Sequence, residues 1–530
     1  MLAALAVWGG VFIARTSLVV EGERYFVLFD DAMISMAYAR NVAAGLGPVW
    51  TPGNEPVEGF TNPLWTGLMV VVNALPVPLR SRPLGVQLAG LALLALTVVR
   101  VRALLVEHFA AGRHGLAGWL PAAVGTGFHA TLLYWSAFGT ETALQALLAV
   151  LAVHLAYDVV FAGRDRHLAL FAVFAAAYLT RMDMALLIGV VAGWVAAHGG
   201  FRRRAARRWL GGAALLVAAA GGYQLFRLAT FGAPLPNTYY LKLGGVPLDV
   251  RLPRGAVKAA WTLLESLVPV LAVVTAVVAG LGRRSRTLLP GLLLAVYLFY
   301  SVWVGGDAWE LPEVPIRLNR FVAFLVPLAA VLANDLLGRG LDRARAAQWR
   351  WAAVPVTGLL LLFANGLVVS EWRPTNWRAV LLLDRPLLVD SNGIVLHNLR
   401  RLERRVAPGA TVVTYWAGIP AYFSRYTMID ALGYADPAIA RRPLPPGTTW
   451  RTYRPGHGKS DPAYLLARRP DAFFQLWDLY HMGVPDPRRL LRDLGYEEIG
   501  EFWLLRGSPY LLPGALDPPG PLDPPANTGI

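Results

Sequence analysis

Two adjacent carboxylates, Asp30 and Asp31, follow the first apolar stretch of the chain in the segment "VLFDDAMISMAYARNVAAGLG". A carboxylate at the edge of an apolar bundle can accept the proton of an alcohol as that alcohol attacks an activated sugar. If the leaving group is a phosphate attached to lipid, cations must stabilise the charge that builds up on it, a role that Arg and Lys serve. This chemistry requires acids and cations on one side of the apolar segments.

The loops on the side of the two aspartates contain both kinds of group. Candidates for holding a donor phosphate are Lys242, Arg320, Arg181 and His457. Candidates for supporting the site or binding an acceptor are Glu58, Glu141, Asp307 and Lys459. Ionisable groups at membrane depth are costly and tend to mark function.

Each of these residues also has a plainer interpretation. Asp30 or Asp31 can cap the helix predicted to start there, although capping explains one aspartate better than two. Arg181 and Asp183 can pair with each other at a helix end, and Lys242 can extend its ammonium to the membrane surface. Glu141 can serve as an acidic residue at a helix start, and Asp307 as a turn residue or cap.

Metal and cofactor signals are weak. The chain has no cysteine, which excludes disulfides, thiolate metal sites and cysteine nucleophiles. Asp30, Asp31, Glu58 and Glu141 offer oxygens to a hard divalent cation, with Asp31 and Glu141 as the first candidates. His129 and His154 fall within apolar segments and are expected to pack or to bond between helices. The Gly-rich fingerprints of nucleotide sites are missing from the sequence.

The elements that must position these residues are membrane helices. The chain has 530 residues, 56% of them hydrophobic, and a mean hydropathy of +0.46. Continuous apolar runs favour helices over barrel strands, which would alternate with a period of two. Eleven spans are predicted at 3–20, 84–105, 117–136, 140–162, 167–182, 184–199, 209–229, 257–281, 287–304, 320–337 and 351–370.

Loop charges predict the orientation of this bundle. The net charge of +15 comes almost entirely from arginine, and runs such as "RRRAARR" fall in alternate loops. Retention of positive loops in the cytoplasm places the N-terminus inside, in a multi-pass protein of the bacterial inner membrane, and gives no reason to expect nucleic acid. The segment 63–79 is short and broken by Pro76 and Pro78, so we expect a re-entrant or interfacial helix within the first outer loop, 21–83.

The composition changes after residue 370. Residues 1–370 form the predicted transmembrane module, and residues 371–510 are polar and proline-rich. The segment "ATVVTYWAGIPAYF" predicts a buried strand followed by a helix, and "PDAFFQLWDLY" predicts a further strand. A small extracytoplasmic α/β domain is therefore expected, followed by a disordered tail at 511–530.

Several segments resemble a known family in chain order. These are "FDDAMISMAYARNVAAGLGPVWTPGNEPVEGFTNPLW", "FGTETAL", "LTRMDM", "GAPLPNTYYLKLGG", "VGGDAWE" with the following "NRFVAFLVPLAAVL" and, near the C-terminus, "TYWAGIPAYFSRYTMIDALGYADPAIA" and "RPGHGKSDPAYLLARRPD". They are similar to motifs of bacterial integral-membrane glycosyltransferases of the GT-C fold that use polyprenyl-phosphate donors. The greatest similarity is to the terminal arabinofuranosyltransferase (AftB-like) group.

The resemblance implies an inverting transfer of a sugar, arabinofuranose being one candidate, from a polyprenyl phosphate to a cell-envelope glycan or lipid. It implies that Asp30 or Asp31 is the catalytic base and that Glu141 supports the site. Two departures stand out. Asp183 follows Met where a Pro-Glu pair is more usual, and Ala37 stands where an arginine is common.

Two other classes of function compete with this interpretation. A transporter or flippase predicts charges at the middle of the bilayer and some repeat symmetry, but the ionisable residues concentrate on one face and we find no repeat. A non-enzymatic envelope scaffold would need no cluster of acids and cations on one side.

Overall fold

The structure is a computed structural model. It describes residues 1–109, 115–116, 118–265, 286–310, 319–343, 369–370, 373–374, 378, 380–386, 388–475, 479 and 483–518. The predicted span at 351–370 lies almost wholly outside the described residues, as do the second half of the span at 257–281, Arg317 and most of the predicted tail.

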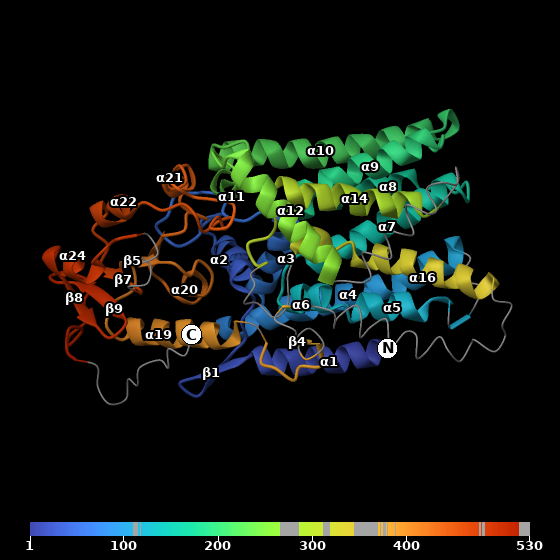
Figure 1. Cartoon of the computed structure of the whole chain (residues 1–530). Helices are drawn as coiled ribbons and strands as arrows, with labels where there is room; N and C mark the ends of the chain where they lie inside the picture. Colours follow the sequence, from blue (N-terminus) through green and yellow to red (C-terminus); the bar gives the residue numbers. More distant parts are fainter. Residues whose placement is uncertain are drawn as a thin grey trace.

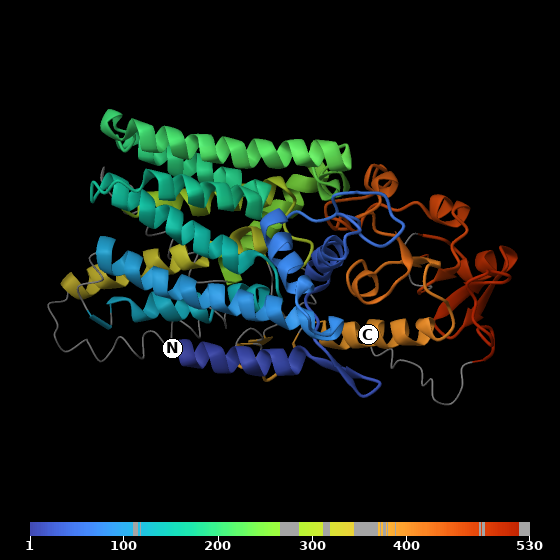
Figure 2. The same ribbon diagram turned by 180° about the vertical axis from the view of Figure 1, so that it is seen from behind.

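Long helices lie side by side in one bundle, with the C-terminal sheet at one end of it (Figures 1 and 2). The helices of the bundle are α1 (Leu2–Thr16), α4 (Arg82–His108), α5 (Leu120–Gly127), α6 (Ala130–Ala137), α7 (Thr142–Val160), α8 (His167–Thr180), α9 (Ala185–Ala197), α10 (Ala206–Phe231), α12 (Leu248–Glu265), α14 (Leu288–Trp303) and α16 (Val326–Arg343).

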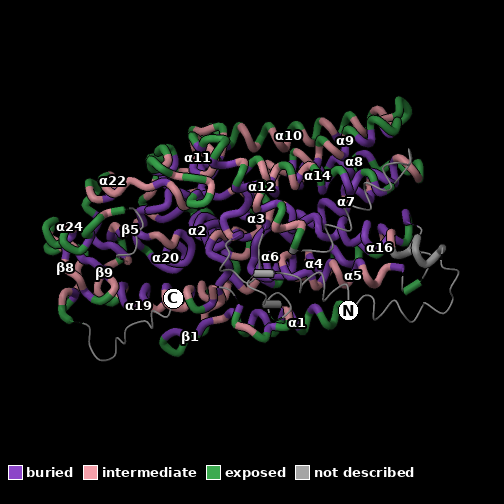
Figure 3. Tube along the Cα trace, viewed as in Figure 1, coloured by how far each residue is buried: buried purple, intermediate pink, exposed green. Residues whose placement is uncertain are grey.

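Three stretches of helix among the described residues are long and apolar enough to cross a membrane. They are Leu79–His108, Thr142–Val160 and Arg203–Phe231. Six further apolar helices have 10–17 residues, so the predicted total of eleven spans stays a prediction. The apolar window of the last stretch is only 6% buried, and Figure 3 shows α10 largely exposed along the outer edge of the bundle. A long exposed apolar face of this kind fits contact with lipid.

The predicted span at 117–136 is wrong as a single helix. The structure divides it into α5 and α6, because His129 adopts an extended backbone conformation between them. Gly125 and Gly127 lie in the last turn of α5, where glycine weakens a helix by about 1 kcal/mol relative to alanine. Apolar composition alone therefore overstated the length of this element.

The first outer loop lies between the bundle and the C-terminal segment (Figure 2). After the hairpin of β1 (Leu18–Val20) and β2 (Glu23–Tyr25), it contains α2 (Asp30–Ala43) and α3 (Pro63–Ala74). Helix α3 is about 18 Å long, shorter than the hydrocarbon core, and packs against α2 and α4. Helix α2 also contacts α20 of the C-terminal segment.

The C-terminal segment contains a mixed five-stranded sheet in the order β6-β5-β7-β9-β8. Strands β6, β5 and β7 are parallel, whereas β9 is antiparallel to β7 and to β8. The strands are β5 (Thr411–Thr414), β6 (Thr427–Asp430), β7 (Ala472–Phe473), β8 (Tyr496–Ile499) and β9 (Phe502–Leu505). The predicted strand-to-helix unit is observed as β5 followed by α20 (Ile419–Phe423).

The remaining elements are short, apart from one helix of the C-terminal segment, α19 (Val389–Glu403). They are α11 (Asn237–Lys242), α15 (Arg320–Ala323), β3 (Val369–Ser370), β4 (Arg373–Pro374), α21 (Pro437–Ala440), α22 (Pro462–Ala467) and α24 (Pro487–Asp493). The 3₁₀ turns are η1 (Leu79–Ser81), η3 (Met182–Met184) and η4 (Arg203–Ala205). Of these elements, η3, α11 and α15 contribute residues to the site.

Candidate active site

A cavity of about 220 Å³ lies where the start of α2, the turn before α7, α11 and α15 meet the C-terminal segment. Its ionisable lining residues, tyrosines aside, are Asp31, Glu141, Arg181, Asp183, Lys242, Asp307 and Arg320. All of these except Asp183 are among the predicted site residues, and they come from five regions of the chain. Aromatic side chains complete the wall, including those of Phe60, Tyr300, Phe321 and Tyr434.

Arg320 bridges two carboxylates at one side of the cavity. Its Nη1 donates to Asp31 Oδ2 at 2.6 Å, and its Nε donates to Asp307 Oδ2 at 3.0 Å. Burial raises the pKa of the Asp31 carboxyl, but Arg320 and Lys242 outweigh this effect and hold that pKa below its ordinary value. Asp31 is therefore ionised at neutral pH.

A second arginine bridge stands in the same cavity. Arg181 Nη1 donates to Glu141 Oε1 at 2.9 Å, and Arg181 Nη2 donates to Asp183 Oδ2 at 2.8 Å. The other oxygen of Glu141 accepts a bond from Asn62 Nδ2 at 2.8 Å. The predicted pairing of Arg181 with Asp183 is thus confirmed. The same guanidinium also forms an ion pair with Glu141.

Lys242 supplies a cation of a different kind. Within the part of the chain that the structure describes, its ammonium forms no ion pair, and it lies 5.2 Å from the centre of the Tyr434 ring. Burial lowers the pKa of this ammonium to about 8, although Asp31 opposes the shift. Lys242 is charged at neutral pH and is not held by a carboxylate, so it is available to an anion in the cavity.

The neighbouring aspartates have different surroundings. Neither caps α2 through a side-chain hydrogen bond, so that part of the capping interpretation is wrong, but both lie in the first turn of α2, where negative charge suits the helix dipole. Asp30 Oδ1 accepts bonds from the backbone N–H groups of Gly418 at 3.1 Å and Ile419 at 3.3 Å. A Cβ at Gly418 would lie 2.5 Å from that oxygen, so the close approach requires glycine. Asp30 joins α2 to the C-terminal segment and does not line the cavity.

Asp30→Asn is expected to flatten the pH dependence of stability. Burial, and next the charge of Asp31, raises the pKa of Asp30 to about 7 in the folded chain. Protonated Asp30 therefore stabilises the folded state. This contribution to the free energy of unfolding is complete below about pH 4 and is lost as the pH rises through 7. Between pH 5 and pH 8 the wild-type chain should lose about 2–3 kcal/mol relative to the variant. Thermal unfolding of both proteins at pH 5 and pH 8 measures this difference. An equal change of stability in the wild type and in Asp30→Asn would contradict a raised pKa of Asp30.

Besides Asp30, three predicted site residues lie outside the cavity lining, namely Lys459, His457 and Glu58. Lys459 Nζ donates to the carbonyl oxygens of Tyr240, Gly244 and Ala440 at 2.7–2.8 Å, which uses all three of its protons. His457 lies among the rings of Trp309, Tyr415 and Tyr434. Burial, aided by Arg454, lowers the pKa of His457 to about 3, so the ring is neutral at neutral pH.

Glu58, the third of these residues, forms a buried pair with Arg227 of α10. Its carboxylate accepts bonds from Arg227 Nε at 2.5 Å and from the Tyr223 hydroxyl at 2.6 Å. The side chains of Glu58 and Arg227 are each 1% exposed. This contact ties the first outer loop to the bundle.

Glu58→Ala is expected to destabilise the protein by about 3–5 kcal/mol, because it leaves a buried guanidinium without its carboxylate. Glu58→Gln should cost less, since the amide oxygen still accepts a bond. The exposed neighbour Glu55 provides the control, and Glu55→Ala should unfold at the wild-type temperature. A Glu58→Ala protein as stable as the control would show that the pair contributes nothing.

The carboxylates of the cavity do not fit a divalent cation in this arrangement. Asp31 bonds Arg320 and Glu141 bonds Arg181, and these arginine side chains are only 14% and 17% exposed, so they have little solvent to move into and cannot readily leave their carboxylates to a cation.

Sequence reasoning missed Tyr434 and Asn62. Tyr434 presents its ring to Lys242, and Asn62 positions Glu141. The first follows the sheet strand β6 and the second precedes α3. Both lie in segments that resemble the family, but nothing in their local sequence marks their side chains as part of a site. Only the folded arrangement brings them to the cavity.

Comparison with known proteins finds a domain family of unknown function and solved structures of low sequence identity. The profile of a domain family described as a domain of unknown function (DUF8728) matches residues 392–513. The chain matches no curated protein. It is similar to two crystal structures of ArnT from Cupriavidus metallidurans, each at 15% identity and a TM-score of 0.45. The structure bound to undecaprenyl phosphate covers 80% of this chain and 84% of its own, and the apo structure covers 82% and 86%.

Proposed function

We propose that the chain is a membrane glycosyltransferase of the GT-C type, which transfers a sugar from a polyprenyl phosphate to a glycan or lipid of the cell envelope. The observation that carries this proposal is the pairing, in one cavity, of an ionised carboxylate, Asp31, with a cation, Lys242, that forms no ion pair with any residue the structure describes. The exposed apolar face of α10 and the other apolar helices support a membrane setting for a lipid donor.

Asp31 serves as the base in this mechanism. The acceptor hydroxyl oxygen bonds to the anomeric carbon of the sugar as the bond between that carbon and the phosphate oxygen breaks. The hydroxyl proton passes to the Asp31 carboxylate, and the phosphate leaves with the bonding electron pair. A single displacement of this kind inverts the configuration at the anomeric carbon.

Lys242 binds the leaving phosphate in this mechanism, and the two arginine bridges position the carboxylates. Lys242 stabilises the charge on the leaving phosphate, because no carboxylate of the described residues takes its protons. Arg320 holds Asp31 in place and keeps it ionised, and Arg181 fixes Glu141 beside the acceptor path. The sequence resemblance supports arabinofuranose as the sugar. The loop charges support a cytoplasmic N-terminus and an extracytoplasmic C-terminal domain.

Mass spectrometry of the purified full-length protein tests the donor class. The protein should carry a polyprenyl phosphate, and incubation with polyprenyl-phosphate sugars of several classes should release free polyprenyl phosphate from one of them. A flippase would bind such lipids without cleaving them. Binding without cleavage of any sugar class in the presence of envelope acceptors would reject the transferase.

A further inference from the structure

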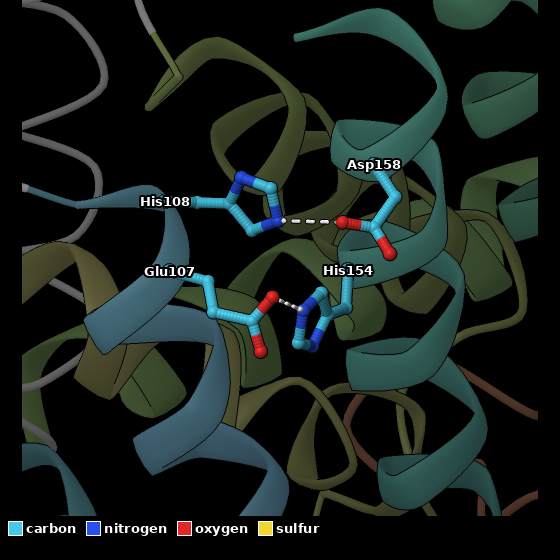
Figure 4. Close-up of side chains that lie close together, drawn as sticks. All are labelled: Glu107, His108, His154 and Asp158. Atoms are coloured by element: carbon cyan, nitrogen blue, oxygen red, sulfur yellow. Dashed lines mark hydrogen bonds and ion pairs between the residues drawn. The ribbon is translucent and has the colours of Figure 1, made fainter. Parts of the chain in front are cut away.

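A second cluster of ionisable side chains lies at the opposite end of α7 from the cavity (Figure 4). Glu107 and His108 form the last turn of α4, while His154 and Asp158 are one turn apart on α7. With a rise of 1.5 Å per residue, His154 and Asp158 are about 20 and about 25 Å from Glu141 along the helix. It therefore belongs to a different part of the molecule.

The four side chains point toward a common centre, as Figure 4 shows. One ligand atom of each lies within 4.8 Å of the corresponding atom of every other residue. His108 Nε2 is 3.2 Å from Asp158 Oδ1, and His154 Nε2 is 3.6 Å from Glu107 Oε2. Ligands around a tetrahedral zinc ion are about 3.3 Å apart, so small side-chain movements would complete such a site.

The chemistry of the donor set selects a class of metal. Two imidazole nitrogens and two carboxylate oxygens suit zinc and similar divalent transition metals better than calcium or magnesium, which prefer oxygen ligands alone. His108, His154 and Asp158 are buried, so these polar groups are held inside the bundle. The C-terminal turns of α4 and α7 meet here, and helix C-termini favour positive charge.

Two arginines supply positive charge to the cluster in this structure. Arg164 Nη1 donates to Glu107 Oε2 and to Asp158 Oδ1, both at 2.9 Å, and Arg166 lies 3.9 Å from Asp158 Oδ2. The side chains of Arg164 and Arg166 are 50% and 56% exposed, so both can swing into solvent. Two carboxylates and two neutral imidazoles carry two negative charges, which one divalent ion would balance in place of the arginines.

We infer that Glu107, His108, His154 and Asp158 bind one zinc-class ion, which joins the ends of α4 and α7, and that Arg164 competes with this ion for the carboxylates. The site is structural and takes no part in sugar transfer. The inference goes beyond the proposed function and does not depend on it. The sequence predicted that His154 packs or bonds between helices. Its contact with Glu107 of α4 is such a bond, and we assign it to the metal-free state of the site.

Zinc binding to the full-length protein in detergent, after treatment with a chelator, tests the inference. The wild type should bind one Zn²⁺ per chain in competition with a chromogenic chelator, and X-ray absorption should show two imidazole ligands. Affinity should fall as the pH drops and the imidazoles become protonated. His108→Gln and His154→Gln should each weaken binding by at least about 100-fold, because loss of an outer partner alone costs 10–100-fold.

Two further variants keep the test decisive if the histidine variants fold poorly. Glu107→Gln, at a half-exposed position, should also weaken binding, whereas Arg164→Gln should tighten it, since a competitor is removed. His198→Gln is the matched control, because this histidine is exposed at the end of α9 and should leave affinity unchanged. The inference is overturned if the wild type binds no stoichiometric zinc, if Glu107→Gln and the histidine variants bind like the control, or if Arg164→Gln weakens binding.

Discussion

Asp31→Asn is expected to lower the rate of sugar transfer by about 10³-fold, within the 10²–10⁴-fold range that a positioned base contributes. The amide cannot accept the acceptor proton at neutral pH, but its oxygen can still accept the bond from Arg320 Nη1. The fold should therefore survive, and the unfolding temperature should stay near that of the wild type. The measurement is release of polyprenyl phosphate from the donor by the purified protein.

Asp30→Asn is the matched control for this result. The two residues are adjacent and chemically identical, but Asp30 bonds the backbone of Gly418 and Ile419 instead of facing the cavity. Its replacement should change the rate by less than about tenfold, the scale of one neutral hydrogen bond. A large loss of activity in Asp30→Asn together with normal activity in Asp31→Asn would show that Asp30 is the base and that the assignment to Asp31 is wrong.

Lys242→Met is expected to reduce kcat/KM for the donor by about 10²–10³-fold. Each arginine bridge of the cavity contains two carboxylates and one guanidinium, so each keeps one net negative charge. The four carboxylates and three cations that line the cavity give it a net charge of −1, so the loss of Lys242 makes this −2 and strengthens the repulsion of an anionic donor. Methionine keeps the length and apolar contacts of the side chain, so the effect isolates the charge.

The pH dependence separates charge from shape at this position. Because burial lowers the pKa of Lys242 to about 8, donor binding by the wild type should weaken as the pH rises above 8 and the ammonium loses its proton. Lys242→Arg keeps its charge throughout this range and should remove that alkaline loss. A wild-type KM for the donor that is equal at pH 7 and pH 9 would contradict a role for this ammonium.

Loop charge allowed much of the site to be predicted from the sequence. Arginine-rich loops alternate with acidic ones, so Asp31, Glu141, Lys242 and Arg320 were expected on one face although they are far apart in the chain. The structure brings all four to one cavity. The unit of β5 and α20 was predictable because a short buried run followed by Gly-Ile-Pro has a strong local signal.

Other features depend on contacts between distant segments. Successive residues of a helix point about 100° apart, so Asp30 and Asp31 have different surroundings, and the sequence cannot say which of them faces the cavity. Lys459 looks like a free surface cation, but its protons are used by carbonyl groups of two remote segments. Glu58 pairs with Arg227, a residue 169 positions away that no local pattern connects to it.

The position of a bound lipid phosphate tests the central claim most directly. A cryo-electron microscopy structure of the purified protein with a polyprenyl phosphate should place the phosphate within hydrogen-bond distance of Lys242 Nζ, with the Asp31 carboxylate facing the same space. A phosphate bound elsewhere on the protein, with Lys242 and Asp31 free of it, would contradict the proposed mechanism.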